Sequence, residues 1–139
     1  MTHHIRAIRT SAAPAPVQGA PYSQGVDVTG QRMVFASGQV PVDPATGALD
    51  GGDAAAQTRR VLANLRAVLE AGGASLQDVV KTTVFLTDLA GDFGAMNAVY
   101  AEVFAGHAPA RSTVGVAALP LGARVEIEAV AVVPEDEED

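Results

Sequence analysis

Arg111 and Glu126 are of the residue types that can bind an acid and move protons. Arg111 lies near the start of Pro109–Val116, PARSTVGV, a segment that otherwise has the apolar character of a buried strand. Glu126 lies near the start of a second apolar segment, Val125–Val133. A guanidinium can hold a carboxylate through two parallel hydrogen bonds, and a carboxylate can accept or donate protons. Together the two residues suggest a site for a small carboxylic acid.

The two segments must form strands for this site to exist. A connection of about eight residues separates 111–116 from 125–133, so the strands could pair and bring Arg111 near Glu126. A structural ion pair at a sheet edge would use the same residues. From the residues alone we favour that structural interpretation.

The composition excludes several classes of site. The chain has 139 residues, of which 48% are hydrophobic and 18% charged, as expected for one compact domain. It has no cysteine, which excludes disulfides, zinc–thiolate sites and cysteine nucleophiles. Its three histidines, His3, His4 and His107, are too few and too scattered for a metal site, so we expect none.

The net charge of −7 is concentrated at the C-terminus, where residues 135–139 carry five of the sixteen acids. The remaining chain has eleven acids against nine basic residues, so it lacks the excess of basic charge that is typical of nucleic-acid-binding proteins. No apolar run approaches the ~20 residues that span a bilayer, and because the first residues have no apolar h-region we expect no secretory signal. We expect a cytoplasmic protein without a membrane partner, folded as a single domain over 1–133, with a disordered acidic tail at 134–139.

Apolar spacing and capping residues predict two helices. The first runs over Asp53–Ala71, with Asp53 as its N-cap, and the second over Asp92–Ala105, ended by Gly106. Ser75–Asp78 resembles a capping box that opens a single helical turn.

Strands are expected between and around these helices. The segments 26–28 and 32–37 should form a hairpin through a turn at 29–31. The order of elements indicates an α+β domain with two helices packed on one face of a mixed sheet. Because 79–87 and 125–133 are partly apolar on both faces, the other face of the sheet favours oligomerisation. The expected strands are 4–8, 26–28, 32–37, 79–87, 111–116 and 125–133.

The string PARSTVGVAALPLGARVEIEA, residues 109–129, resembles the C-terminal signature of the RidA/YjgF family of reactive imine/enamine deaminases. Similar segments cover nearly all of 19–133, although Ala20 separates the glycine from the proline in the first of them. In chain order they are GAPYSQGV (19–26), FASGQVPVDPATG (35–47), QTRRVLANLRAVLEAGG (57–73), VVKTTVFLTDL (79–89) and MNAVYAEVF (96–104).

The resemblance implies a chorismate-mutase-like (YjgF-like) α+β fold that assembles as a homotrimer with active sites in clefts between subunits. It also implies hydrolysis of 2-imino and 2-enamino acids, such as 2-aminoacrylate and its imine, to 2-keto acids and ammonia. PLP-dependent dehydratases release such intermediates. No cofactor or metal is expected, and the expected partners are the small-molecule substrate and further copies of the chain.

The resemblance also assigns roles to individual positions. Arg111 is implied to bind the substrate carboxylate, and Glu126 to orient the attacking water or to pass a proton to the leaving ammonia. Thr113 and Gly115 stand where the family often has cysteine and glutamate, which alters the pocket wall and with it the substrate preference. The positions implied to bind substrate are Tyr22, Ser37, Gly38, Asn97 and Thr113.

Two other functions compete with deamination. One is a small-metabolite (keto-acid) binding or regulatory module on the same fold, since a fold alone does not fix chemistry. The other is a ribonuclease or translation inhibitor, a label carried by some relatives, which the lack of aromatic and basic clusters argues against. By residue type alone, structural roles are favoured for Tyr22, Ser37 and Asn97, and only their positions in the motifs favour a role in the site.

Overall fold

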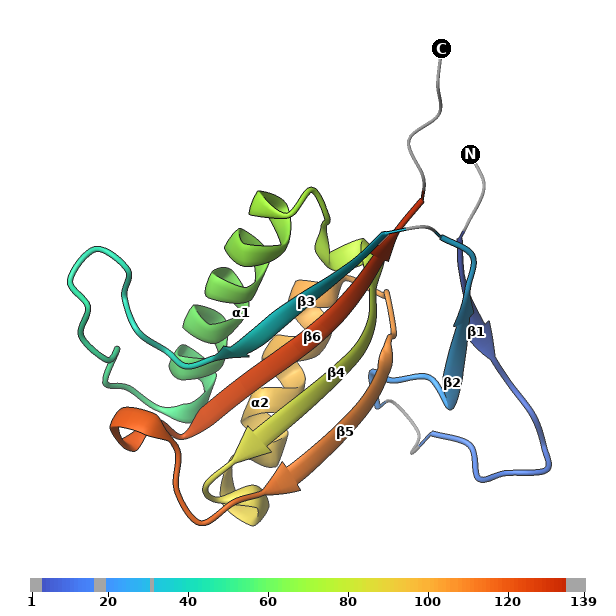
Figure 1. Ribbon diagram of the computed structural model, residues 1–139. Helices are drawn as coiled ribbons and strands as arrows, with labels where there is room; N and C mark the ends of the chain where they lie inside the picture. Colours follow the sequence, from blue (N-terminus) through green and yellow to red (C-terminus); the bar gives the residue numbers. More distant parts are fainter. Residues whose placement is uncertain (1–3, 17–19, 31, 135–139) are drawn as a thin grey trace.

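Four strands form the main sheet, in the order β3-β6-β4-β5 (Figure 1). β6 is antiparallel to both of its neighbours, whereas β4 and β5 are parallel, so the sheet is mixed as predicted. The strands are β3 (Arg32–Gln39), β4 (Val79–Leu86), β5 (Ala110–Gly115) and β6 (Val125–Val133).

The computed structural model describes residues 4–16, 20–30 and 32–134. The last five acidic residues, for which disorder was expected, lie outside this part, as does His3.

Two helices, α1 (Ala54–Ala71) and α2 (Leu89–Phe104), lie on the same face of the main sheet (Figure 1). The first matches the prediction, and its N-cap Asp53 accepts a hydrogen bond from the Ala56 amide at 2.9 Å. The second begins at Leu89, three residues earlier than the predicted start at Asp92, because Asp88 caps it. None of the described helices is long and apolar enough to cross a membrane.

The predicted capping box also forms. Ser75 and Asp78 bond reciprocally around a single 3-10 turn at Leu76–Asp78, which leads directly into β4.

Residues of β6 alternate between the two faces of the sheet. One set is buried beneath the helices, whereas Glu126 and Glu128 belong to the opposite face. That opposite face carries Met33 and Phe35 of β3, which are 55% and 70% exposed. The buried set is Val125, Ile127, Ala129, Ala131 and Val133.

The predicted hairpin between 26–28 and 32–37 is wrong. β2 (Gly25–Val28) pairs instead with β1 (Ile5–Ile8) in a separate two-stranded ribbon. The Gln24 side chain explains this pairing, because its amide donates to the carbonyls of Thr10, Ala13 and Pro14 and folds the connection back. The ribbon lies beside β5 (Figure 1), and the segment just before β2 contacts β5 through an isolated bridge between Ser23 and Ala110.

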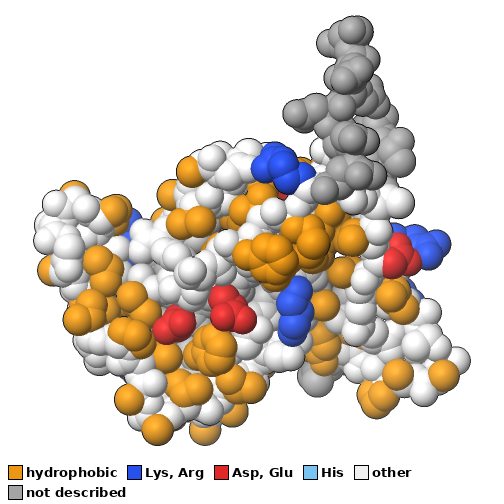
Figure 2. Space-filling view, in the orientation of Figure 1, with side chains coloured by type: hydrophobic (Ala, Val, Ile, Leu, Met, Phe, Trp, Pro, Cys, Tyr) orange, Lys and Arg blue, Asp and Glu red, His pale blue; other side chains and the backbone are white. Residues whose placement is uncertain are grey.

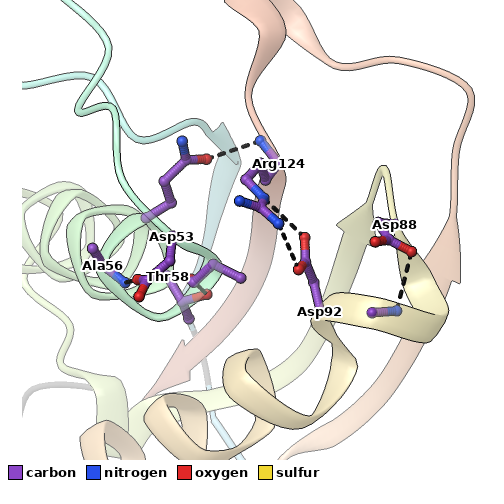
Figure 3. A network of polar contacts seen from close by, with 9 residues as sticks. Asp53, Ala56, Thr58, Asp88, Asp92 and Arg124 are labelled. Atoms are coloured by element: carbon purple, nitrogen blue, oxygen red, sulfur yellow. Dashed lines mark hydrogen bonds and ion pairs between the residues drawn. The ribbon is translucent and has the colours of Figure 1, made fainter.

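A polar network ties the start of β6 to both helices (Figure 3). Arg124 donates from Nε and Nη2 to the two carboxylate oxygens of Asp92, at 3.1 and 2.9 Å. Its backbone N–H donates to Oε1 of Gln57 at 2.9 Å. Because Asp92 and Gln57 are buried, these bonds satisfy groups that would otherwise lose their hydration uncompensated.

A second polar pair lies at the centre of the core, where the Tyr100 and Thr82 hydroxyls are 2.7 Å apart. Burial raises the pKa of Tyr100 to about 12, although the Thr82 hydrogen bond and the Arg111 charge act in the opposite direction.

The raised pKa of Tyr100 predicts a loss of stability in alkali. An unfolded tyrosine ionises near pH ~10. The stabilisation is therefore complete below about pH 10 and is lost as the pH rises towards the folded value of about 12. Over that range the free energy of unfolding should fall by roughly 2–3 kcal/mol more than in a Tyr100→Phe variant, which has no such ionisation. Urea denaturation of both proteins at about pH 8 and pH 11.5 measures this, and parallel pH dependences would contradict it.

Candidate active site

Arg111 lies on edge strand β5 and points towards the helices. In the parallel register it stands beside Thr82 of β4, and residues paired in this way share a face of the sheet. Thr82 bonds Tyr100 of α2, which fixes that face as the one beneath the helices. The Arg111 side chain therefore enters the space between β5 and α2.

Aromatic rings and one amide surround the Arg111 guanidinium. Nη1 donates to Oδ1 of Asn97 at 2.6 Å, and Asn97 is the one described hydrogen-bond partner of this side chain. Cζ lies 4.9, 5.5 and 5.8 Å from the ring centres of Tyr100, Tyr22 and Phe93. Burial lowers the pKa of Arg111, against the opposing influence of Tyr100 and Tyr22, but an arginine stays charged at neutral pH. The remaining N–H donors can hold an anionic ligand.

Thr113 follows on the same face, opposite the buried Val84. Its Oγ1 is the one buried side-chain polar atom of the described residues that lacks a hydrogen-bond partner. Since this oxygen is buried while the residue is partly exposed, the exposed part of Thr113 is carbon surface or backbone.

Glu126 lies on the opposite face of the sheet. It pairs with Phe85 of β4, away from the helices, and its carboxylate sits over the backbone of Gly38 on β3. A Cβ at position 38 would lie 1.9 Å from Oε2 of Glu126, so only glycine leaves the carboxylate in this place. Ser37 precedes Gly38 and is exposed.

The predicted pairing of 111–116 with 125–133 is wrong, because β4 lies between the two strands. The crossover through α2 returns the chain parallel to β4 on its outer side, and β6 then enters between β3 and β4. Arg111 and Glu126 consequently occupy opposite faces on either side of β4.

The predicted site residues form two groups. The Arg111 group consists of Arg111, Tyr22, Asn97 and Thr113. The Glu126 group consists of Glu126, Gly38 and Ser37. The described chain brings each group together and keeps the two groups apart.

Sequence reasoning missed Phe93 and Tyr100 as neighbours of Arg111. Their spacing from Asn97, four residues before it and three after it, was the available signal, since it places all three on one side of a helix.

Comparison with known proteins gives close matches along almost the whole chain. The family model described as "Endoribonuclease L-PSP" matches residues 10–133. A 2-iminobutanoate/2-iminopropanoate deaminase of Salmonella typhimurium is 49% identical over 130 residues, covering 91% of this chain and 97% of that protein.

Two solved structures from E. coli extend the comparison. The YjgF gene product superposes with a TM-score of 0.68 at 49% identity, covering 91% of this chain and 98% of that one. TdcF, solved with bound serine, gives a TM-score of 0.68 at 46% identity, covering 92% and 98%.

The close approach at Gly38 yields a prediction about Glu126. Gly38→Ala should displace the carboxylate, because the added Cβ overlaps Oε2, while the flexible side chain moves away at little cost in stability. Activity that depends on Glu126 should then fall towards that of Glu126→Gln, with an unchanged denaturation midpoint. Gly51→Ala is the matched control, since nothing lies within 4 Å of a Cβ there. Full activity in Gly38→Ala would show that the position of Glu126 is not critical.

Proposed function

The chain belongs to the endoribonuclease L-PSP family, which is the RidA/YjgF family, and we propose that it hydrolyses 2-imino and 2-enamino acids to 2-keto acids and ammonia. The observation that carries this proposal is the half-buried Arg111, whose guanidinium has one donor bound to Asn97 and others available for a substrate carboxylate. The name of the Salmonella relative supports the reaction, and the serine bound to TdcF supports an amino-acid-like ligand.

Arg111 acts as the anchor of the substrate. Its planar fork holds the carboxylate through two hydrogen bonds, and the bond to Asn97 fixes the plane of the guanidinium. The rings of Tyr22, Phe93 and Tyr100 displace water from around the charge, which strengthens the attraction to an anionic substrate.

Glu126 handles the water and the protons. Water adds its oxygen to C2 of the protonated imine (C=NH2⁺) as the carboxylate takes one proton of the water, which gives a neutral tetrahedral amino alcohol. The carboxylate then returns that proton to the nitrogen, the C2–N bond breaks, and the C2 hydroxyl proton is released as the keto group forms. One water is consumed, and one keto acid and one ammonia leave, with no oxidant or reductant required.

A second copy of the chain must supply Glu126 to the substrate on Arg111, because β4 separates the two within one subunit. The sheet face without helices has the character of an interface: Met33 and Phe35 are exposed on it, beside a hollow of about 150 Å³ lined in part by Lys81 and Val130. Figure 2 views this face, with hydrophobic side chains gathered over the sheet beside acidic and basic ones.

We therefore propose a chorismate-mutase-like homotrimer. In it the Arg111 group of one subunit faces the Glu126 group of the next, and each subunit boundary holds one site.

Charge distribution disfavours RNA cleavage, despite the name of the family. Among the described residues, Arg6, Arg59, Arg60 and Arg124 each form an ion pair with an acid, which neutralises much of the basic charge that could attract a nucleic acid. Binding of a keto acid without turnover would use the same Arg111 contacts. Only a measurement of imine hydrolysis therefore distinguishes the two functions.

The central prediction is that the protein diverts imines from a chemical trap. A PLP-dependent threonine dehydratase supplies 2-aminobutenoate and its imine, and semicarbazide competes for the imine. Wild type should lower semicarbazone formation, whereas Arg111→Ala should reduce kcat/KM on the order of a hundredfold, since charge-assisted hydrogen bonds contribute about 1.5–3 kcal/mol each. Arg111→Lys should recover only a small part of the lost kcat/KM, because an ammonium cannot reproduce the two parallel hydrogen bonds to the carboxylate.

Two outcomes would contradict this proposal. Unchanged semicarbazone formation with wild type would leave the keto-acid binding module, for which calorimetry with 2-keto acids is the test. If the Arg111→Ala variant is as active as wild type, Arg111 does not bind the substrate carboxylate.

The shared site predicts complementation between inactive subunits. Arg111→Ala and Glu126→Gln should each be nearly inactive as homotrimers. Refolded together in equal amounts, they should recover about a quarter of wild-type activity, because in random trimers one boundary in four pairs an intact Arg111 with an intact Glu126. Light scattering of the mixture should report three 14.1 kDa chains per particle.

The control replaces the Glu126→Gln partner by the double variant Arg111→Ala/Glu126→Gln, which offers no intact Arg111. No recovery in the first mixture would show that the two residues do not share a site across a boundary.

A further inference from the structure

The sheet face without helices carries a basic and an acidic side chain around one hollow. Lys81 of β4 and Glu128 of β6 both line the hollow of about 150 Å³ on this face, together with the exposed ring of Phe35. Both alternate along their strands with residues buried beneath the helices, so they share the opposite face. The wall of the hollow therefore holds one charge of each sign.

The strand register gives Lys81 two diagonal neighbours on this face. Glu128 stands opposite Thr83 on the β6 side, and Ser112 stands opposite Thr83 on the β5 side. A long side chain can reach either diagonal position. Nζ of Lys81 donates to Oγ of Ser112 at 3.1 Å, whereas Lys81 and Glu128 take part in none of the ion pairs among the described residues. The ammonium turns to its uncharged neighbour and leaves Glu128 without a cation.

Both charges would lose their hydration if a second subunit covered this face. An unpaired charge in a covered interface is costly, so each charge there needs a partner of opposite sign. Phe35 and Met33 give the same face an apolar surface that favours such covering. Because one face carries both signs, the base of one copy can meet the acid of the next. A second copy of the chain therefore fits this charge pattern.

The spacing of these charges matches that of the proposed site. Lys81 and Arg111 lie on neighbouring strands one residue apart in register, which corresponds to a Cα separation of about 6 Å. Glu126 and Glu128 lie two residues apart along β6, which corresponds to about 7 Å. Since β5 is the edge strand, a neighbour that covers β4 also passes beside Arg111. With its Glu128 at Lys81, that neighbour can bring its Glu126 to Arg111.

We propose that Lys81 of one subunit and Glu128 of the next pair across the boundary and fix the register in which Glu126 faces Arg111. Both are positioning residues, because they act through the placement of Glu126 and not on the substrate. Phe35 can make apolar contact in several registers, whereas the charge pair forms in one. This inference rests on the proposed function, since it takes the site to be shared between subunits.

The test reverses the two charges singly and together. Lys81→Glu places two acids at the boundary and Glu128→Lys two bases, so each should raise the concentration at which half of the chains are trimeric by at least about tenfold. The double variant Lys81→Glu/Glu128→Lys restores opposite charges and should return that concentration to within about threefold of wild type. Light scattering over a dilution series measures it. Imine hydrolysis should follow the trimeric fraction, because Arg111 and Glu126 are intact in all three variants.

Mixing the two single variants distinguishes a pair across the boundary from a pair within one subunit. A mixed trimer has opposite charges at two of its three boundaries, whereas a trimer of either variant alone has like charges at all three. The mixture should therefore form trimers at a lower concentration than either variant alone. A pair within one subunit would be repulsive in both variants and would gain nothing from mixing, which would overturn the inference.

Two exposed residues of α1 supply the matched controls. Arg66→Glu and Glu70→Lys make the same changes of charge away from the sheet face, and neither they nor their mixture should alter assembly. If a reversal at Lys81 or Glu128 prevents folding, as judged by urea denaturation, Lys81→Gln and Glu128→Gln replace it. Each should weaken assembly, and the second substitution should add little to the first. Additive effects would overturn the pair.

The outcomes keep this inference distinct from the proposed function. Single reversals that stay trimeric and active, or a double variant that regains nothing, would overturn the pair and leave the deaminase standing. Rescue of assembly in a protein whose wild type hydrolyses no imine would support the pair and overturn the deaminase. A wild type that is monomeric at every concentration would overturn both the pair and the shared site.

Discussion

The central position of strand β4 prevents Arg111 and Glu126 of a single subunit from sharing one site. β4 separates the strand that carries Arg111 from the strand that carries Glu126, and the pleat directs the two side chains to opposite faces. A parallel return through a helix places β5 on the outer side of β4, so this separation is a property of the topology and not of side-chain packing. One subunit therefore holds the proposed carboxylate anchor and the proposed proton-transferring acid in places from which they cannot act on the same molecule.

Helix α2 determines the environment of the anchor. Near its N-terminus the buried Asp92 is held by Arg124, which immediately precedes β6 (Figure 3). Nearer its C-terminus Tyr100 is held by a hydrogen bond with Thr82. Asn97 and Phe93 lie between these attachments and face Arg111. Partial burial of a guanidinium has a cost, and a helix fixed at two points keeps the compensating rings and amide in place.

The elements of the sheet and helices were largely predictable. Capping residues such as Asp53 and Ser75 act on adjacent amides, so local sequence places the start of α1 and the single turn before β4. Pairing between strands was less predictable. The hairpin expected at 26–37 does not form, because Gln24 folds the preceding connection and pairs β2 with β1 through hydrogen bonds that no local pattern indicates.

Residue types and motif positions were enough to name Arg111, Glu126 and their neighbours as candidate site residues. The reason is that the identity of each residue determines which chemical group its side chain carries. The roles assigned to those residues remain predictions. Their grouping was decided only in three dimensions: strand order and pleat place Arg111 beneath α2 and Glu126 over Gly38 on the other face. The rings around Arg111 come from segments far apart in sequence, Tyr22 before β2 and Tyr100 on α2. Local sequence sets which groups exist and which element holds each one, whereas their distances depend on contacts between segments that fold together only in the complete domain.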